Sequence, residues 1–223
     1  MARELLLFLN ENEIPCGYEI LDTFTTQYIC DLISWGPLEL ALQKVKRIDN
    51  LFRAFPCPLD LKIIAVEIWI LLQTQWYPYQ HCFYGINGNG KVAIVRKKEN
   101  KDTHVILRGS KYGTNYDVAS INDMKNTLKN KNLRENVMVD CSHGNSNKNY
   151  KNQMNVIDYI VNLLSENNDT VMGFMVESNL MEGKQILKFG EADKLEWGKS
   201  ITDSCVNMDE TDEMIKKIYS ALF

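Results

Sequence analysis

Several side chains that could bind a metal ion or an anion stand at or just after the ends of apolar segments. The apolar segments are 105–107, 137–139 and 173–176. The side chains that follow them are Arg108, Asp140, His143 and Glu177. In a parallel α/β barrel the carboxyl ends of the strands converge on one mouth, where such barrels carry their chemistry. We therefore predict that these groups share one rim, with Asp203 in the loop-like segment 198–203 as a fifth candidate.

The residue types at this rim favour two kinds of ligand. An imidazole with carboxylates suits divalent manganese, iron, cobalt or zinc, and these groups are costly to bury together without a cation. Arg108, beside Gly109, offers a planar fork for a phosphate or a carboxylate. Taken singly, each group is equally compatible with a helix cap, a surface charge or a structural histidine. The sequence is equally compatible with Lys199 as a solvent-exposed lysine and with residues 145–147 as caps of the next helix.

Hydrophobic patterning predicts the elements that position these groups. Segments 81–86 and 91–96 flank the turn sequence 87–90, which is typical of a β-hairpin. Further strands are predicted at 103–107, 136–140 and 171–176. Helices are predicted at 120–129, at 150–164 and, after a cap at Asp209, at about 210–222. Apolar strands that alternate with helices indicate an α/β fold with a parallel sheet buried on both faces.

The chain divides into three stretches, 1–36, 37–80 and 81–223. The first is predicted to form a helix at 2–9, a short strand at 17–21 and a second helix capped by Thr25 or Thr26. The middle stretch holds four of the five prolines, two of the four tryptophans and no glycine. Within it, 37–53 could form an amphipathic helix, whereas periodicity does not decide between helix and strand for 63–72.

Composition excludes several classes of protein. The 223 residues carry 25 Lys and Arg against 29 Asp and Glu, a net charge of −4, which argues against a basic nucleic-acid surface and against disorder. The apolar run at 63–72 is too short to span a bilayer, and the start of the chain lacks a secretory signal. The six cysteines form no C-x-x-C pair, so we expect reduced thiols and a cytoplasmic location. We expect neither a membrane nor a nucleic acid as a partner.

Five sequence strings resemble the microbial 3-deoxy-7-phosphoheptulonate (DAHP) synthases, particularly the fungal phenylalanine- or tyrosine-inhibited type. They are T-H-V-I-L-R-G at 103–109, K-Y-G-T-N-Y-D at 111–117, D-C-S-H-G-N-S at 140–146, M-V-E-S-N-L at 175–180 with Glu182 and Gly183, and G-K-S-I-T-D at 198–203. Residues 2–36 also match, through Leu21 and Asp22, 27–29 and 31–36. The resemblance thus covers the first stretch and nearly all of 81–223.

The resemblance implies a transferase of aromatic amino-acid biosynthesis, at the first step of the shikimate pathway. Such enzymes condense phosphoenolpyruvate with erythrose 4-phosphate at the mouth of a (β/α)8 TIM barrel. By their positions in these motifs, His143, Glu177 and Asp203 resemble three ligands of a divalent ion. The resemblance does not fix which of Mn, Fe, Co and Zn is bound. Arg108 and His143 resemble substrate-binding residues. The resemblance also makes a homo-oligomer possible, without fixing its size or its inhibitor.

Several family motifs have no counterpart here. The family's first two strands, with a metal-ligand cysteine in G-P-C-S-I-H-D and the phosphate-binding K-P-R-T, lie upstream of this chain. We therefore expect an incomplete TIM barrel that starts at about the third strand, and no measurable synthase activity from the chain itself. The alternatives are a catalytically inactive fragment, or a metal-dependent lyase or hydrolase that uses the remaining ligands.

The middle stretch departs from the family in a specific way. Two further motifs, G-A-R-T-T-E-S-Q-x-H-R and P-x-G-F-K-N, belong at 37–65 and are absent. Codons can be chosen for 36–50, and for 57–62 onward, so that triplets started one nucleotide earlier spell both motifs. This favours the hypothesis that 37–80 is a frame-shifted translation, with the frame restored near residues 80–81. The competing interpretation is a divergent insert with its own helix.

Overall fold

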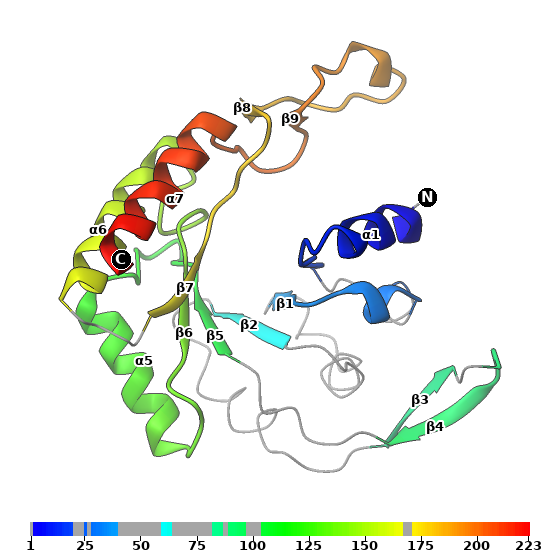
Figure 1. Ribbon diagram of the computed structural model, residues 1–223, viewed down its shortest axis with the longest axis horizontal. Helices are drawn as coiled ribbons and strands as arrows, with labels where there is room; N and C mark the ends of the chain where they lie inside the picture. Colours follow the sequence, from blue (N-terminus) through cyan, green and yellow to red (C-terminus); the bar gives the residue numbers. More distant parts are fainter. Residues whose placement is uncertain are drawn as a thin grey trace. The chain divides into compact units, whose positions relative to one another are not determined.

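The structure is a computed structural model of the 223-residue chain. It describes residues 2–19, 25, 28–39, 59–63, 82–86, 89–96, 104–166 and 171–223. The chain separates into two compact units, Met1–Val105 and Ile106–Phe223, and strand β5 crosses from one to the other. Figure 1 labels the elements of both units.

In its described residues, the first unit contains helix α1, two parallel strands and a hairpin, besides helical residues at 25, 28 and 29. Its elements are α1 (Ala2–Glu11), the 3-10 turn η1 (Cys30–Leu32), β1 (Gly36–Glu39), β2 (Leu59–Ile63), β3 (Cys82–Ile86) and β4 (Val92–Arg96). Strands β1 and β2 are parallel, and Gly36 pairs with Leu59. Strands β3 and β4 are antiparallel, with Ile86 opposite Val92. The predicted hairpin and the first predicted helix are therefore confirmed.

Other expectations for the first unit need correction. The predicted strand at 17–21 is reduced, in its described part, to one bridge between Gly17 and Trp35, because hydrogen bonds tie Cys16 to Ser34 and Tyr18 to Trp35 without extending further. The second predicted helix is confirmed at its described residues 25, 28 and 29, but it ends as a 3-10 turn at 30–32. The segment that starts at Pro37 begins as β1, not as a helix. The rest of the predicted 37–53 helix, and 63–72 beyond Ile63, lie outside the described residues.

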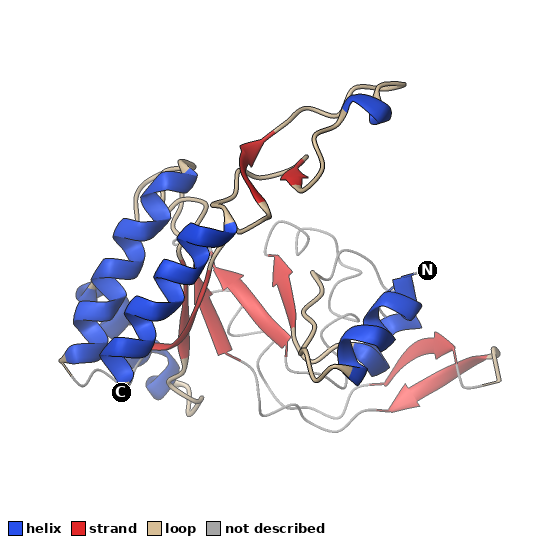
Figure 2. Cartoon of the chain, turned by 45° about the horizontal axis from the view of Figure 1, so that its top comes forward, coloured by secondary structure: helices blue, strands red, loops and turns tan. Residues whose placement is uncertain are grey.

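The second unit alternates strands and helices. In chain order it contains α5 (Val118–Asn130), β6 (Val137–Asp140), η3 (Tyr150–Asn152), α6 (Gln153–Ser165), β7 (Val171–Met175), β8 (Met181–Lys184), η4 (Ala192–Lys194), β9 (Lys199–Ser200) and α7 (Met208–Leu222). Strand β6 lies between β5 (His104–Leu107) and β7, and it is parallel to β7. Figures 1 and 2 show α5, α6 and α7 along one side of these strands. This confirms the α/β class and the parallel sheet.

Burial differs between the strands. All four residues of β5 are buried, as expected for a strand covered on both faces. In β7 only Val171 is buried, and Met172 is 47% exposed. Among the described strands β7 pairs with β6 alone, so it is an edge strand here. The prediction of burial on both faces is therefore right for β5 and wrong for β7.

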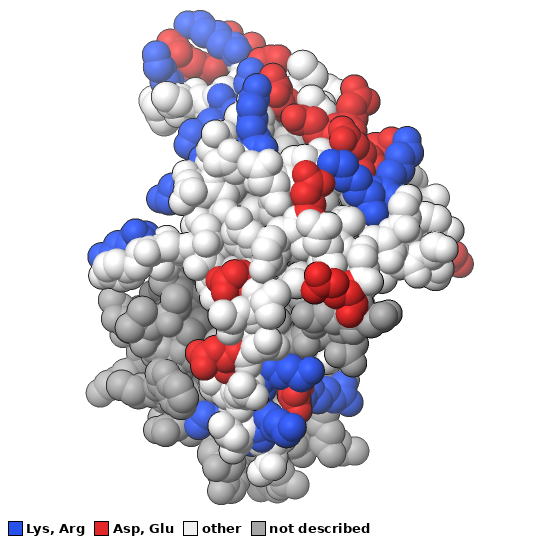
Figure 3. Space-filling view, turned by 90° about the vertical axis from the view of Figure 1, so that its left-hand side faces the viewer, with Lys and Arg blue, Asp and Glu red and all other residues white. Residues whose placement is uncertain are grey.

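Helix α6 supplies much of the core. Its buried apolar residues recur at helical spacing, at Val156, Ile157, Ile160 and Leu163. On its outer side, Lys217 of α7 lies 2.7 Å from Asp158 of α6. Figure 3 shows acidic and basic side chains close to one another over this helical face. None of the helices that the structure describes is long and apolar enough to cross a membrane.

Two helix caps are defined by side-chain hydrogen bonds. Asp117 begins α5 and accepts from Ser120 N–H over 2.9 Å. Helix α7 starts at Met208, and Asn207 forms a reciprocal capping box with Glu210. The prediction of Asp209 as the cap is therefore wrong, because Asn207 already satisfies the first free N–H groups of the helix.

Candidate metal centre

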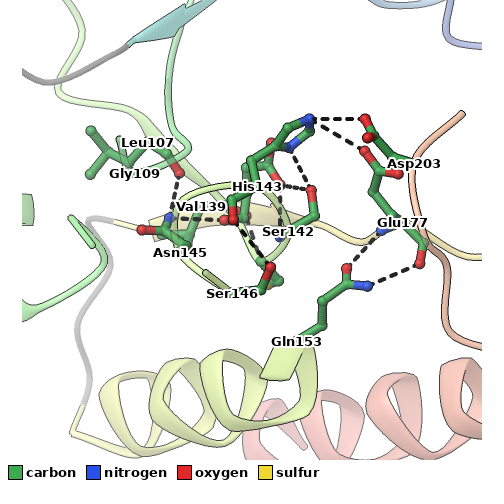
Figure 4. A network of polar contacts seen from close by, with 12 residues as sticks. Leu107, Gly109, Val139, Ser142, His143, Asn145, Ser146, Gln153, Glu177 and Asp203 are labelled. Carbon is green, nitrogen blue, oxygen red and sulfur yellow. Dashed lines mark hydrogen bonds and ion pairs between the residues drawn. The ribbon is translucent and has the colours of Figure 1, made fainter. Parts of the chain in front are cut away.

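Three of the predicted rim residues lie together (Figure 4). One ligand atom from each of His143, Glu177 and Asp203 lies within 4.8 Å of the other two. His143 Nε2 is 3.4 Å from Glu177 Oε1 and 3.6 Å from Asp203 Oδ2. His143 follows β6, Glu177 follows β7 and Asp203 follows β9, so three chain segments supply the cluster.

Asp140 lies beneath His143 instead of at the rim. Its side chain is fully buried, and Oδ2 lies 2.9 Å from His143 Nδ1. Ser142 donates to Asp140 Oδ1 from its N–H over 2.9 Å and from its hydroxyl over 2.6 Å. Burial alone raises the pKa of Asp140, but the interactions with His143 and Ser142 outweigh it and lower the pKa below its usual range.

This contact sets the chemistry of the imidazole. A carboxylate at Nδ1 favours the tautomer in which Nδ1 carries the proton, which leaves the lone pair of Nε2 free to bind a cation. Nε2 is the atom that faces Glu177 and Asp203. His143 itself has φ of 49°, a left-handed conformation that residues other than glycine rarely adopt and that is found at functional sites.

Asn145 connects the ends of β5 and β6. Its side chain is buried, and Nδ2 donates to the carbonyls of Leu107 over 3.0 Å and of Asp140 over 2.9 Å. Its Oδ1 accepts from Asn115 N–H over 2.9 Å, and Asn115 Oδ1 accepts from Gly109 N–H over 2.7 Å. Asn145 thus holds two strand ends in register, and residues 145–147 do not cap the next helix, because Asn149 caps η3 and Asn152 stands at the N-cap of α6.

Arg108 stands at the end of β5, next to Gly109, as expected from the sequence. Its carbonyl accepts from Asn145 N–H over 3.2 Å, which ties the residue to the loop that carries His143. Its role as a phosphate or carboxylate ligand stays a prediction. Lys199 has a more ordinary environment, since its ammonium pairs with Glu196 at 2.9 Å.

The donor set fits a hard or borderline divalent cation. Two carboxylates repel each other at this separation, and an ion between them and a neutral imidazole removes the repulsion. The exposed fraction of the side chain is 17% for His143, 22% for Glu177 and 64% for Asp203. The cluster is therefore open to solvent on the side of Asp203. Within the described residues no cysteine sulfur belongs to the cluster. Burial raises the pKa of the thiol in both Cys141 and Cys205, which keeps them protonated.

These features define a class of protein: an α/β protein with a parallel sheet and a histidine–carboxylate centre beyond the carboxyl ends of its strands. The chain belongs to the DAHP synthetase I family, whose model matches residues 4–217. The resemblance inferred from the motifs is thereby confirmed.

Individual relatives agree with this assignment. The chain is 36% identical over 227 residues to the Phe-sensitive phospho-2-dehydro-3-deoxyheptonate aldolase of Escherichia coli, covering 100% of this chain and 63% of that protein. It is 34% identical over 229 residues to a putative enzyme of the same name in Schizosaccharomyces pombe, covering 100% of this chain and 61% of that protein. A solved structure of the Francisella tularensis aldolase matches with a TM-score of 0.88 and 33% identity, over 99% of this chain and 64% of that one. The chain thus spans less than two thirds of the length of these relatives.

Proposed function

We propose that this chain carries the metal-binding part of a DAHP synthase site, the site that joins phosphoenolpyruvate to erythrose 4-phosphate. The observation that carries the proposal is the convergence of His143 Nε2 with the carboxylates of Glu177 and Asp203. Membership of the family supports the choice of reaction. The fold that accompanies it is an incomplete (β/α)8 barrel.

The residues take distinct roles in this proposal. His143, Glu177 and Asp203 hold the divalent ion, which, when bound, polarises the aldehyde or positions a water molecule. Asp140 keeps the His143 ring oriented and its proton on Nδ1. Arg108 binds the phosphate or carboxylate of phosphoenolpyruvate through its fork of N–H groups.

The reaction balances without a redox step. Carbon 3 of phosphoenolpyruvate forms a bond to the aldehyde carbon of erythrose 4-phosphate, water adds at carbon 2, and inorganic phosphate leaves. Both substrates are phosphorylated anions, so cationic side chains are needed to bind them. This chain offers Arg108 for that purpose, whereas the family motif K-P-R-T does not occur in its sequence.

Activity is tested by following phosphoenolpyruvate consumption with erythrose 4-phosphate, with and without a chelator. We expect no measurable turnover by the 223-residue chain, because each missing charge-assisted hydrogen bond costs about ten- to a hundredfold in affinity. A chain extended by the family's first two strands, with both absent motifs restored at 37–80, should turn over and should stop when the ion is removed. If the extended chain is folded but inactive, or active in chelator, the proposal fails.

The frame-shift interpretation of 37–80 is likewise a proposal. It is supported by the absence of both family motifs from a stretch where the flanking sequence matches the family closely. Resequencing the gene decides it, since an insertion or a deletion must be found at each end of the stretch. An unbroken reading frame supports a divergent insert instead.

A further inference from the structure

Gln153, the first residue of α6, is a polar residue with a fully buried side chain. Its carboxamide makes two hydrogen bonds to the main chain of a single residue, Glu177 (Figure 4). Glu177 N–H donates to Gln153 Oε1 over 2.8 Å, and Gln153 Nε2 donates to the Glu177 carbonyl over 3.1 Å. A residue 24 positions away in the sequence is thus attached at two points.

The two hydrogen bonds from Gln153 hold the chain beyond the end of strand β7. Strand β7 ends at Met175, so Glu177 lies beyond the last residue of the strand. Its carbonyl also accepts from Val206 N–H over 2.9 Å. Together these bonds fix the peptide groups on both sides of the Glu177 Cα atom, and this fixes the direction in which the side chain leaves the main chain.

The position of Gln153 is itself well determined. The helix that it begins is anchored in the core through Val156, Ile157 and Ile160, all of which are buried. A carboxamide held by such a helix is a rigid support, because its rotamer cannot change without breaking both hydrogen bonds in a buried place. Gln153 therefore connects the main chain of Glu177 to the buried core.

We propose that Gln153 is a positioning residue of the metal centre, which holds the main chain of Glu177 so that its carboxylate faces His143 Nε2. This inference rests on the proposed function, since it requires Glu177 to bind the ion. Partners that orient a metal ligand typically contribute about 10- to 100-fold to metal affinity. We expect a loss in this range when both hydrogen bonds are removed.

The chain offers a matched control in Gln185. Its Oε1 accepts from Glu196 N–H over 2.8 Å, and its Nε2 donates to the Glu196 carbonyl, also over 2.8 Å. The same side chain thus makes the same pair of bonds to another glutamate, and its Nε2 also donates to the Lys199 carbonyl over 2.9 Å. Glu196 does not belong to the three-residue cluster and pairs with Lys199 instead.

The experiment compares Gln153→Met with Gln185→Met in the full chain. Methionine has a similar length and volume and removes the two hydrogen bonds of Gln153 or the three of Gln185. Mn²⁺ affinity is measured by calorimetry, and the visible absorption of bound Co²⁺ reports the coordination geometry. We expect Gln153→Met to weaken Mn²⁺ binding about 10- to 100-fold and to alter the Co²⁺ spectrum. Gln185→Met should affect both less than Gln153→Met, because the two residues that it releases, Glu196 and Lys199, lie outside the cluster.

The outcomes separate this inference from the proposed function. Far-ultraviolet circular dichroism checks folding, and Gln153→Asn, which keeps an amide but withdraws it by one methylene, replaces Gln153→Met if that variant does not fold. Wild-type Mn²⁺ affinity and Co²⁺ spectrum in folded Gln153→Met, or in folded Gln153→Asn where it is used instead, overturn the inference alone, provided that His143→Ala abolishes binding. A wild-type chain that binds no Mn²⁺ overturns both.

Discussion

Replacing His143 by alanine is expected to abolish Mn²⁺ binding by this chain, with a larger effect than the roughly 10- to 100-fold cost of losing an outer-shell partner. His143 provides the imidazole of the cluster, and its Nε2 is 3.4 Å and 3.6 Å from oxygens of Glu177 and Asp203. Without it, two carboxylates remain, and the buried carboxylate of Asp140 keeps only its two hydrogen bonds from Ser142. Calorimetric titration of the folded variant measures the loss.

The loss of Mn²⁺ affinity should depend on whether the changed residue belongs to the cluster, and not on the net charge of the region. Glu177→Gln is expected to weaken Mn²⁺ binding strongly, because it replaces a carboxylate of the cluster by a neutral amide. Glu182→Gln makes the same chemical change at a glutamate that instead accepts a hydrogen bond from Tyr150 over 3.2 Å. Equal losses in the two glutamine variants would show that the ion is bound elsewhere.

Replacing Gly144 by alanine is expected to damage both the fold and the site. A Cβ atom there would lie 2.4 Å from Ser110 N and 2.5 Å from the carbonyl carbon of Gly109, and both contacts are with main chain. Relief requires the loop after β5 to separate from the loop that carries His143. We expect the free energy of unfolding to fall by about 3 kcal/mol, the upper end for overpacking, together with weaker Mn²⁺ binding.

Gly173→Ala is the matched control for Gly144→Ala. At Gly173, in β7, the closest neighbour of an added Cβ is the end of the Met138 side chain at 3.4 Å, and a methionine can move aside. We expect a change in unfolding free energy of less than about 1 kcal/mol. Chemical denaturation measures both variants, and a Gly144→Ala chain as stable as Gly173→Ala would contradict the close approach of the two loops.

The sequence predicted that the residues of the proposed ligand set would lie together, because each had a signal in the sequence. His143 and Glu177 follow apolar segments that became β6 and β7, and alternation of strands with helices placed those segments side by side. Asp203 had a weaker signal, since it follows a two-residue strand, β9, that hydrophobic patterning did not reveal. Its place in the set came from the family motif at 198–203.

The supporting residues could not be predicted in the same way. Gln153 and Asn145 act on residues 24 and 38 positions away, so no local pattern links them to their partners. Asp140 follows an apolar segment like the ligands do, and only its complete burial distinguishes a partner of His143 from a ligand.

The most direct test of the metal centre is anomalous X-ray diffraction from crystals of the chain soaked in Zn²⁺, recorded on both sides of the zinc absorption edge. Zinc binds imidazole and carboxylate ligands and can be located without assumptions about its position. We predict an anomalous peak in contact with His143 Nε2 and with the carboxylates of Glu177 and Asp203. Soaked crystals with no peak at these three residues, or with one only elsewhere, would contradict the assignment of the site.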